Sequence, residues 1–159
     1  MYEVDDEYKF LLDMGDYLYK TELPGISKDD REYLAEFLLS EARRNERELE
    51  SRLTNLLYHM LKARYIPELF SRSWVNTISE NNIQLKIFLK GEPSLKQKAV
   101  GLIPECFEHA KIRFNNTART PKELPENCPW TAEQCTDSNY IGSFIEKCKK
   151  ASTNPYYKG

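Results

Sequence analysis

Long hydrophobic runs are absent from this sequence, and several other features are missing with them. No apolar stretch approaches the roughly 18–20 residues that cross a bilayer, and the first residues are acidic, unlike those of a secretory signal peptide. The four cysteines form no Cys-x-x-Cys pair, which argues against a disulfide framework. Only six glycines occur, and none builds a phosphate-binding loop. These absences predict a cytoplasmic protein with reduced thiols, no membrane segment and no cofactor.

Charge is nearly balanced over the chain but unevenly placed along it. The formal net charge of −2 gives no general electrostatic attraction to nucleic acid. Residues 1–16 carry six acidic side chains against the single Lys9, whereas residues 86–122 are net basic. Such asymmetry can guide self-association or the docking of a partner, although solvated helix faces produce the same pattern. The basic side chains of the second segment are Lys86, Lys90, Lys96, Lys98, Lys111, Arg113, Arg119 and Lys122.

A helical stripe occupies the middle of the chain. Ser27, with Asp30 three residues later, predicts the start of a helix that runs to about Tyr65, where Ile66-Pro67 ends it. Within it, apolar positions recur in steps of four and three residues, as on one face of a helix. A stripe this broad needs neighbours on two sides, as in a bundle or a dimer. Its nine positions are Ala35, Leu39, Ala42, Glu46, Leu49, Leu53, Leu56, Met60 and Ala63.

Shorter helices are predicted on both sides of the long one. Ser71 or Ser73 can cap the helix that follows it, and Ser94 with Gln97 forms a second capping box. Pro104 divides or kinks the helix that starts at Ser94. The predicted ranges are 6–20, 71–90 and 94–119, followed by a proline-rich connector over 120–129 and one or two short helices in which Ile141, Phe144, Ile145 and Cys148 face inward.

The fold class follows from these elements and from the length of the chain. No strand pair or internal repeat is visible among the 159 residues, and a chain of this size suits one core. We expect an all-α fold, a helical bundle of about five or six helices around one long central helix. Residues 1–150 form a single helical domain in this prediction, and residues 151–159 form a frayed tail.

Polar and aromatic side chains gather where the long helix gives way to the next. His59 and Lys62 share a polar stripe of the long helix, and Arg72 stands at the start of the following one. A histidine can act as a general base near neutral pH, and an arginine at a helix N-terminus can hold an anion. These three are the candidate catalytic residues. Alternatively, His59 bonds across the bundle, while Ser71, Arg72 and Trp74 form a structural turn.

Metal binding has one weak set of candidates. Cys106 and His109 lie one helical turn apart and Cys128 and Cys135 follow, so a zinc site can be drawn from these four residues. Their spacing matches no structural zinc pattern, and we expect no metal. A simpler interpretation is that Cys128 packs as a small hydrophobe beside Trp130, in a structural motif.

Glu46 is the one charged position in the apolar stripe. A buried carboxylate must be paired or must have a raised pKa. Arg43, Arg47 or an arginine of a partner helix can pair with it, whereas a local shift of the helix face would expose it to solvent.

Six short motifs follow one another in a distinctive order. They are LESRL at 49–53, HMLK at 59–62, SRSW at 71–74 followed by Thr77-Ile78, PSL at 93–95, IPE at 103–105 and PENCPWTAEQ at 125–134. In this combination, over about residues 1–143, the chain resembles the domain of unknown function 29 family, known chiefly from cyanobacteria and other bacteria. The resemblance implies an all-helical fold and a prokaryotic, cytoplasmic setting, and it implies no activity. The chain differs from the family pattern around Pro24–Asp30, at Asn45, where an acid is usual, and at Ala63, where tryptophan is usual.

Three functional hypotheses remain open at this point. The first is a non-enzymatic interaction module that associates with itself, through the broad stripe, or with a protein partner. The second is a hydrolase or nuclease-like enzyme whose site lies at the 59–74 junction, which requires His59, Lys62 and Arg72 to converge. The third is a weak nucleic-acid binder that uses residues 86–122 and binds in a salt-dependent way.

Overall fold

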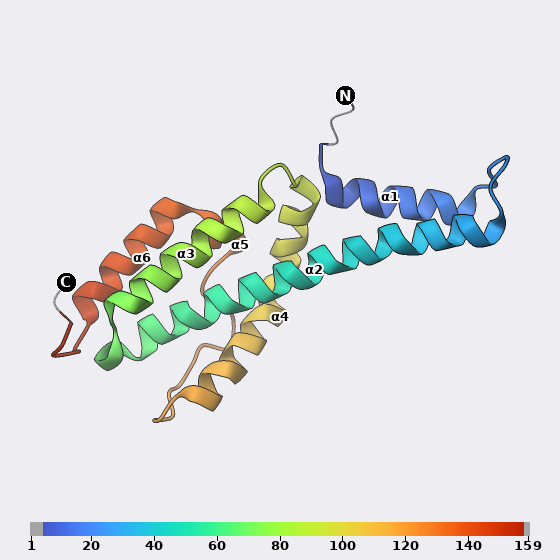
Figure 1. Ribbon diagram of the computed structural model, residues 1–159. Helices are drawn as coiled ribbons and strands as arrows, with labels where there is room; N and C mark the ends of the chain where they lie inside the picture. The colour runs from blue at the N-terminus through green and yellow to red at the C-terminus, as the bar shows by residue number, and fades with distance from the viewer. Residues whose placement is uncertain (1–4, 158–159) are drawn as a thin grey trace.

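The computed structural model describes residues 5–157, which form six α-helices and one short 3-10 helix and contain no strand (Figure 1). The predicted all-α fold around one long helix is confirmed. No helix in this part of the chain combines the length and the apolar character that a membrane crossing needs. In chain order the elements are α1 (Glu7–Lys20), α2 (Lys28–Tyr65), η1 (Pro67–Leu69), α3 (Arg72–Leu89), α4 (Pro93–Thr117), α5 (Ala132–Thr136) and α6 (Ser138–Ala151).

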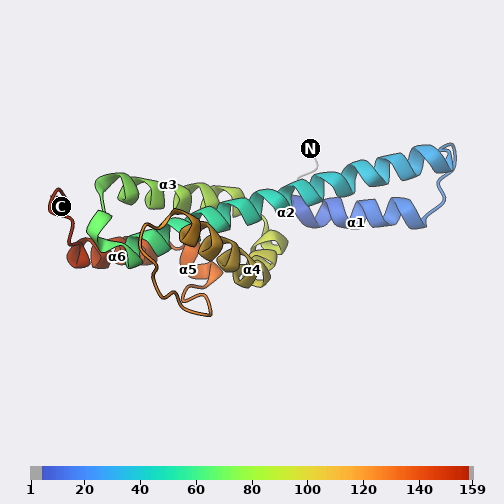
Figure 2. The same cartoon turned by 90° about the horizontal axis from the view of Figure 1, so that it is seen from below.

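Helix α2 is the axis of the molecule. Its 38 residues give it a length of about 57 Å. The C-terminal half of α2 lies among α3, α4 and the helices after them, whereas its N-terminal half runs beside α1 and projects with it as a two-helix hairpin (Figures 1 and 2). We call this hairpin, residues 7–46, the arm, and we call residues 47–157 the body.

The two helices of the arm pack closely and are closed by a buried arginine. A Cβ atom added to Gly15 would lie 2.6 Å from Cγ of Leu39, so only glycine fits this crossing without a shift. At the far end, Nη1 of buried Arg31 donates hydrogen bonds to the carbonyl oxygens of Leu18 at 2.8 Å and Thr21 at 2.7 Å. Arg31 therefore satisfies the last carbonyls of α1 and places a positive charge at that C-terminus, where the helix dipole favours it.

At the base of the arm, Asp6 caps two helices. Its carboxylate accepts hydrogen bonds from the backbone N–H of Lys9, at 3.2 Å, and from the backbone and hydroxyl of Ser94, at 3.0 and 2.6 Å. Burial raises the pKa of Asp6, but the hydrogen bonds from Ser94 and Lys9 outweigh it, so the pKa lies below its ordinary value. The predicted capping box of Ser94 with Gln97 is wrong: α4 begins at Pro93, and Asp6 caps it from a distant part of the sequence.

The predicted stripe of α2 is covered by helices of the same chain. Seven of its nine positions are buried, and Leu39 and Glu46 are half-buried. Glu46 accepts a hydrogen bond from the hydroxyl of Tyr8 and lies 3.9 Å from Nζ of Lys98. Its partners are therefore on α1 and α4 of its own chain, rather than Arg43, Arg47 or a second molecule. This burial also means that the stripe itself is no free surface for association.

The remaining helices form largely as predicted. Ser27 caps α2 and Ser71 caps α3, and α4 runs unbroken through Pro104. Buried Asn82 joins α3 to the corner between α5 and α6, because its amide donates to the carbonyl of Cys135 at 2.7 Å and its oxygen accepts from the hydroxyl of Ser138 at 3.1 Å. The inward positions predicted for the last helix, Ile141, Phe144, Ile145 and Cys148, are all buried.

After Ala151 the chain leaves the helix but stays on the body. The side-chain amide of Asn154 donates to the carbonyl of Phe70 at 2.7 Å, and the backbone of Thr153 donates to that of Pro67 at 3.1 Å. The ring of Tyr157 packs edge-on against Phe70, with centroids 5.1 Å apart. Residues 152–157 are thus docked on the turn after α2, where the sequence predicts a frayed end.

Replacing Asp6 with alanine should lower the free energy of unfolding by about 1–2 kcal/mol, because two helix N-termini lose their cap. Urea unfolding followed by circular dichroism measures this change. The matched control is Asp5→Ala, which removes the same charge from an exposed neighbour. An equal loss in both variants would show that general charge, and not capping, is responsible.

Candidate functional site

One line of polar side chains follows the second half of α2 and lies in the angle between α3 and α4. Its first members, Glu48 and Arg52, form an ion pair of 2.8 Å. Asn55 comes next and binds both neighbouring helices: its amide donates to Oδ1 of Asn81 on α3 at 2.9 Å, and its oxygen accepts from Nη1 of Arg113 on α4 at 2.9 Å. The polar line therefore connects three helices by hydrogen bonds and is not simply a solvated helix face.

His59 follows Asn55 in this line and is half-buried. Its Nδ1 atom is buried and has no hydrogen-bond partner among the described residues. Burial and the positive charges of Lys62 and Arg113 lower the pKa of His59 to about 4. The imidazole is consequently neutral at pH 7, although the sequence predicts a histidine that titrates near neutrality. Within residues 5–157, therefore, no nucleophilic side chain is hydrogen-bonded to Nδ1.

Lys62 ends the polar line, where α2 meets the start of α3. Its ammonium group lies over two aromatic rings, with Nζ 4.6 Å from the ring centroid of Trp74 and 5.2 Å from that of Tyr58. Lys62 lines a hollow of about 370 Å³, together with Arg119 and Lys122 from the segment after α4. A second, more open hollow of about 750 Å³ lies along the earlier part of the line and includes His109 and Arg113.

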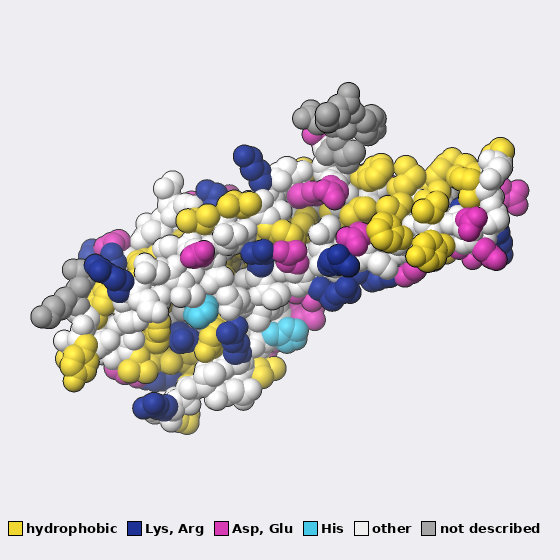
Figure 3. Space-filling view, in the orientation of Figure 1, with side chains coloured by type: hydrophobic (Ala, Val, Ile, Leu, Met, Phe, Trp, Pro, Cys, Tyr) yellow, Lys and Arg dark blue, Asp and Glu magenta, His cyan; other side chains and the backbone are white. Residues whose placement is uncertain are grey.

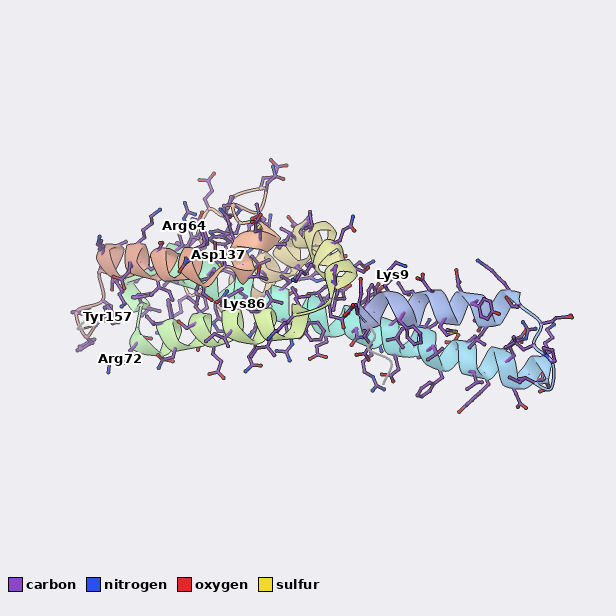
Figure 4. All side chains as sticks on the ribbon, turned by 90° about the horizontal axis from the view of Figure 1, so that it is seen from above. Lys9, Arg64, Arg72, Lys86, Asp137 and Tyr157 are labelled. Carbon is purple, nitrogen blue, oxygen red and sulfur yellow. The ribbon has the colours of Figure 1, made fainter. Side chains whose placement is uncertain are left out.

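The three candidate catalytic residues do not line one pocket. Lys62 lines the smaller hollow, His59 lies one turn before it along α2, and Arg72 lines neither hollow. Arg72 is exposed and lies at the end of the molecule away from the arm, the same end as Tyr157 (Figure 4). The residues that complete the hollow around Lys62 come instead from the segment after α4, which lies more than fifty positions further along the chain.

The side chains of the weak zinc candidates are used in other ways. Cys106 and Cys135 are buried, and burial raises the pKa of both thiols, that of Cys135 to about 12. Sγ of Cys128 donates to the carbonyl of Trp130 at 3.2 Å, while His109 is exposed on the open hollow. Within residues 5–157 no three histidine, cysteine or acidic side chains stand close enough to share a metal ion.

The tryptophans of the two predicted structural motifs lie in different places. Trp130 is 2% exposed and packs edge-on against Phe144, with ring centroids 5.6 Å apart. Trp74 is half-buried, packs edge-on against Phe70 at 6.3 Å and shares the hollow with Lys62. One of them therefore fills the core, whereas the other forms the wall of a surface hollow.

The basic residues of segment 86–122 are divided between two regions. Lys86 lies on α3 and Lys90 directly after it, and Lys96 and Lys98 lie on the first turns of α4. The other four lie on the last turns of α4 and just after it. α4 has 25 residues and spans about 37 Å. The basic segment of the sequence is thus two separate basic regions in space.

An exposed apolar surface lies on the arm, where the sequence stripe gives no sign of it. Figure 3 shows hydrophobic side chains gathered over the α1–α2 hairpin. Tyr33 is 74% exposed and Phe37 is 57% exposed. The two residues lie one turn apart on α2, outside its buried stripe. We call this surface the arm face; its large exposed residues are Phe10, Tyr17, Tyr19, Tyr33, Leu34 and Phe37.

Arm and body also carry opposite charge. The arm, residues 7–46, contains ten acidic and six basic side chains, whereas the body, residues 47–157, contains 12 acidic and 16 basic ones. On the body, Ile83 and Ile87 of α3 are exposed, and Lys86 and Lys90 are exposed beside them at helical spacing. We call these four residues the α3 patch, which is both apolar and basic.

The geometry defines an all-helical protein with a projecting apolar arm and without an assembled catalytic constellation among the described residues. The angle between α3 and α4 that holds the polar line of α2 forms a polar, positively charged groove, which we call the polar groove. The chain belongs to the family described as domain of unknown function DUF29, whose model matches residues 7–141. This confirms the resemblance seen in the short sequence motifs. No curated protein and no solved structure matches the chain.

Protonation of His59 should destabilise the fold in acid. Because its pKa is lowered in the folded state, the contribution of His59 is fully present above about pH 6.5, the ordinary value, and is lost as the pH falls toward 4. One pKa unit corresponds to about 1.4 kcal/mol, and a half-buried group keeps part of its hydration, so we expect about 1–2 kcal/mol. Urea unfolding of wild type and His59→Gln at pH 7 and pH 5 measures the difference.

The other histidine of the chain provides the control. His109→Gln removes an exposed imidazole and leaves His59 in place, so the pH dependence of this variant should follow that of the wild type. If His59→Gln and His109→Gln lose the same stability between the two pH values, His59 is not the group that responds.

Proposed function

We propose that the protein is a non-enzymatic helical interaction module that associates with a second copy of itself. In this proposal the arm face of one molecule packs on the α3 patch of another. The observation that carries the proposal is the arm face, since a two-helix hairpin leaves one side of each helix without a partner. Contiguous exposed apolar surface of this kind is typical of protein interaction sites.

Charge supports a second copy as the occupant. The arm is acidic and the body is basic, so the two surfaces of identical chains complement each other. The α3 patch adds apolar side chains, Ile83 and Ile87, to its two lysines. On the arm, three acids lie at helical spacing from exposed aromatic residues: Asp13 from Phe10, Asp30 from Tyr33 and Glu41 from Phe37. If each arm binds the body of the other copy, the contact occurs twice and the dimer closes with two-fold symmetry.

The four free thiols, three of them buried, suit a reducing setting, and a cytoplasmic, prokaryotic location is part of the proposal.

Phe37→Ser should weaken the dimer at least tenfold, because each copy loses a buried aromatic side chain worth roughly 1.5–3 kcal/mol. Sedimentation equilibrium of the full chain measures the dissociation constant. Ile112→Ser is the matched control, since Ile112 is 58% exposed on α4, outside both surfaces. The unfolding free energy of both variants should stay within about 0.5 kcal/mol of wild type, which separates association from folding.

The two surfaces can be tested against each other by mixing. The double variant Lys86→Glu/Lys90→Glu should not associate with itself, and neither should the double variant Tyr33→Ser/Phe37→Ser. A mixture of the two double variants keeps one intact arm and one intact α3 patch, so it should form a heterodimer that salt weakens. Association that survives the lysine changes would point to contact between two arms, and a strict monomer at millimolar concentration would overturn the proposal.

A further inference from the structure

The hollow around Lys62 has the size and the walls of a small-molecule site. Its volume is about 370 Å³, within the range of about 300–1,000 Å³ that such sites occupy. Its apolar wall is formed by Ile66, Leu69 and Trp74, at the end of α2 and the start of α3. Its other side is formed by Arg119 and Lys122, in the segment that follows α4.

The charges of this hollow are not balanced. Nζ of Lys122 lies 3.4 Å from Oε1 of Glu68, which neutralises one cation. Among the described residues, no carboxylate lies within ion-pair distance, 4.0 Å, of Lys62 or Arg119. Two positive charges therefore remain on a concave surface, and concave surfaces lined by one sign of charge concentrate ions of the other sign.

Lys62 is held in place without an anion. Its ammonium group sits between the rings of Trp74 and Tyr58, and the hydroxyl of Tyr58 is fixed by a 3.0 Å hydrogen bond with Oγ1 of Thr117. Among the described residues the ammonium group of Lys62 makes no hydrogen bond and no ion pair, so it keeps its capacity for charge-assisted hydrogen bonds. The cation is thus positioned before any ligand arrives, which lowers the cost of binding.

We propose that this hollow binds a small organic anion, with its phosphate or carboxylate oxygens on Lys62 and Arg119 and its apolar body against Trp74, Ile66 and Leu69. Arg119 supplies the planar donor pair that both kinds of anionic oxygen accept. The hollow is built from the end of α2 and lies apart from the arm face, so this inference does not depend on self-association.

The two tryptophans of the chain make the test direct. The indole N–H resonance of Trp74 reports on the hollow, and that of buried Trp130 is an internal control. Titration of the full chain with phenyl phosphate and with benzoate distinguishes the two kinds of anionic oxygen. At least one of these anions should shift the Trp74 resonance saturably and leave the Trp130 resonance in place. Neutral benzamide should shift neither resonance.

Variants identify the residues responsible. Lys62→Gln and Arg119→Gln should each weaken binding at least tenfold, while Lys62→Arg, which keeps the charge, should bind within about threefold of wild type. Arg119 is exposed, so its replacement does not endanger the fold. Lys147→Gln is the matched control, because it removes an equal charge from an exposed position on α6.

Three results would overturn the inference: benzamide binding as well as the anions, Lys147→Gln weakening binding as much as Lys62→Gln and Arg119→Gln, or the absence of any saturable shift with either anion.

Discussion

The length of α2 is the constraint on which the rest of the structure depends. A continuous helix of 38 residues is about 57 Å long, and the helices of the body cover only its second half. The first half would leave an apolar stripe in water without α1, which returns along it and buries Ala35 and Ala42. Three residues hold α1 in that position. Asp6 caps its start, Arg31 binds the carbonyl groups at its end, and Gly15 permits its close contact with α2. The large apolar side chains of α1 and α2 that this pairing leaves exposed form the arm face.

The same helix organises the polar groove. Its second half presents apolar residues to the core and a polar line to the angle between α3 and α4, where Asn55 binds both neighbours. Burial beside Lys62 and Arg113 keeps His59 neutral at physiological pH, so the groove is electropositive because of its lysine and arginine side chains rather than its histidine. Interaction and ligand binding are thus proposed at opposite ends of one helix, with the core between them.

Much of the fold could be predicted because its signals are local. The cap at Ser27, the proline after Ile66 and the steps of four and three along α2 depend on near neighbours in sequence, and each of them is found in the structure. The cap of α4 could not be predicted in the same way, because Asp6 reaches it from 88 positions away. Glu46 is similar: its position in the stripe required a partner, but only the packing of α1 brings the hydroxyl of Tyr8 to it.

The sequence by itself determined the helices, their order, the buried stripe and the family, because periodicity, capping residues and short motifs are properties of neighbouring residues. Only the tertiary structure decided which faces stay exposed and which distant side chains meet. The stripe that suggested self-association is covered by the chain's own helices, whereas Tyr33 and Phe37 remain in solvent. Lys62 meets Arg119 and Lys122 in one hollow while Arg72 lies elsewhere. Such meetings depend on how helices cross, and crossing is set by the packing of the whole core rather than by any one segment.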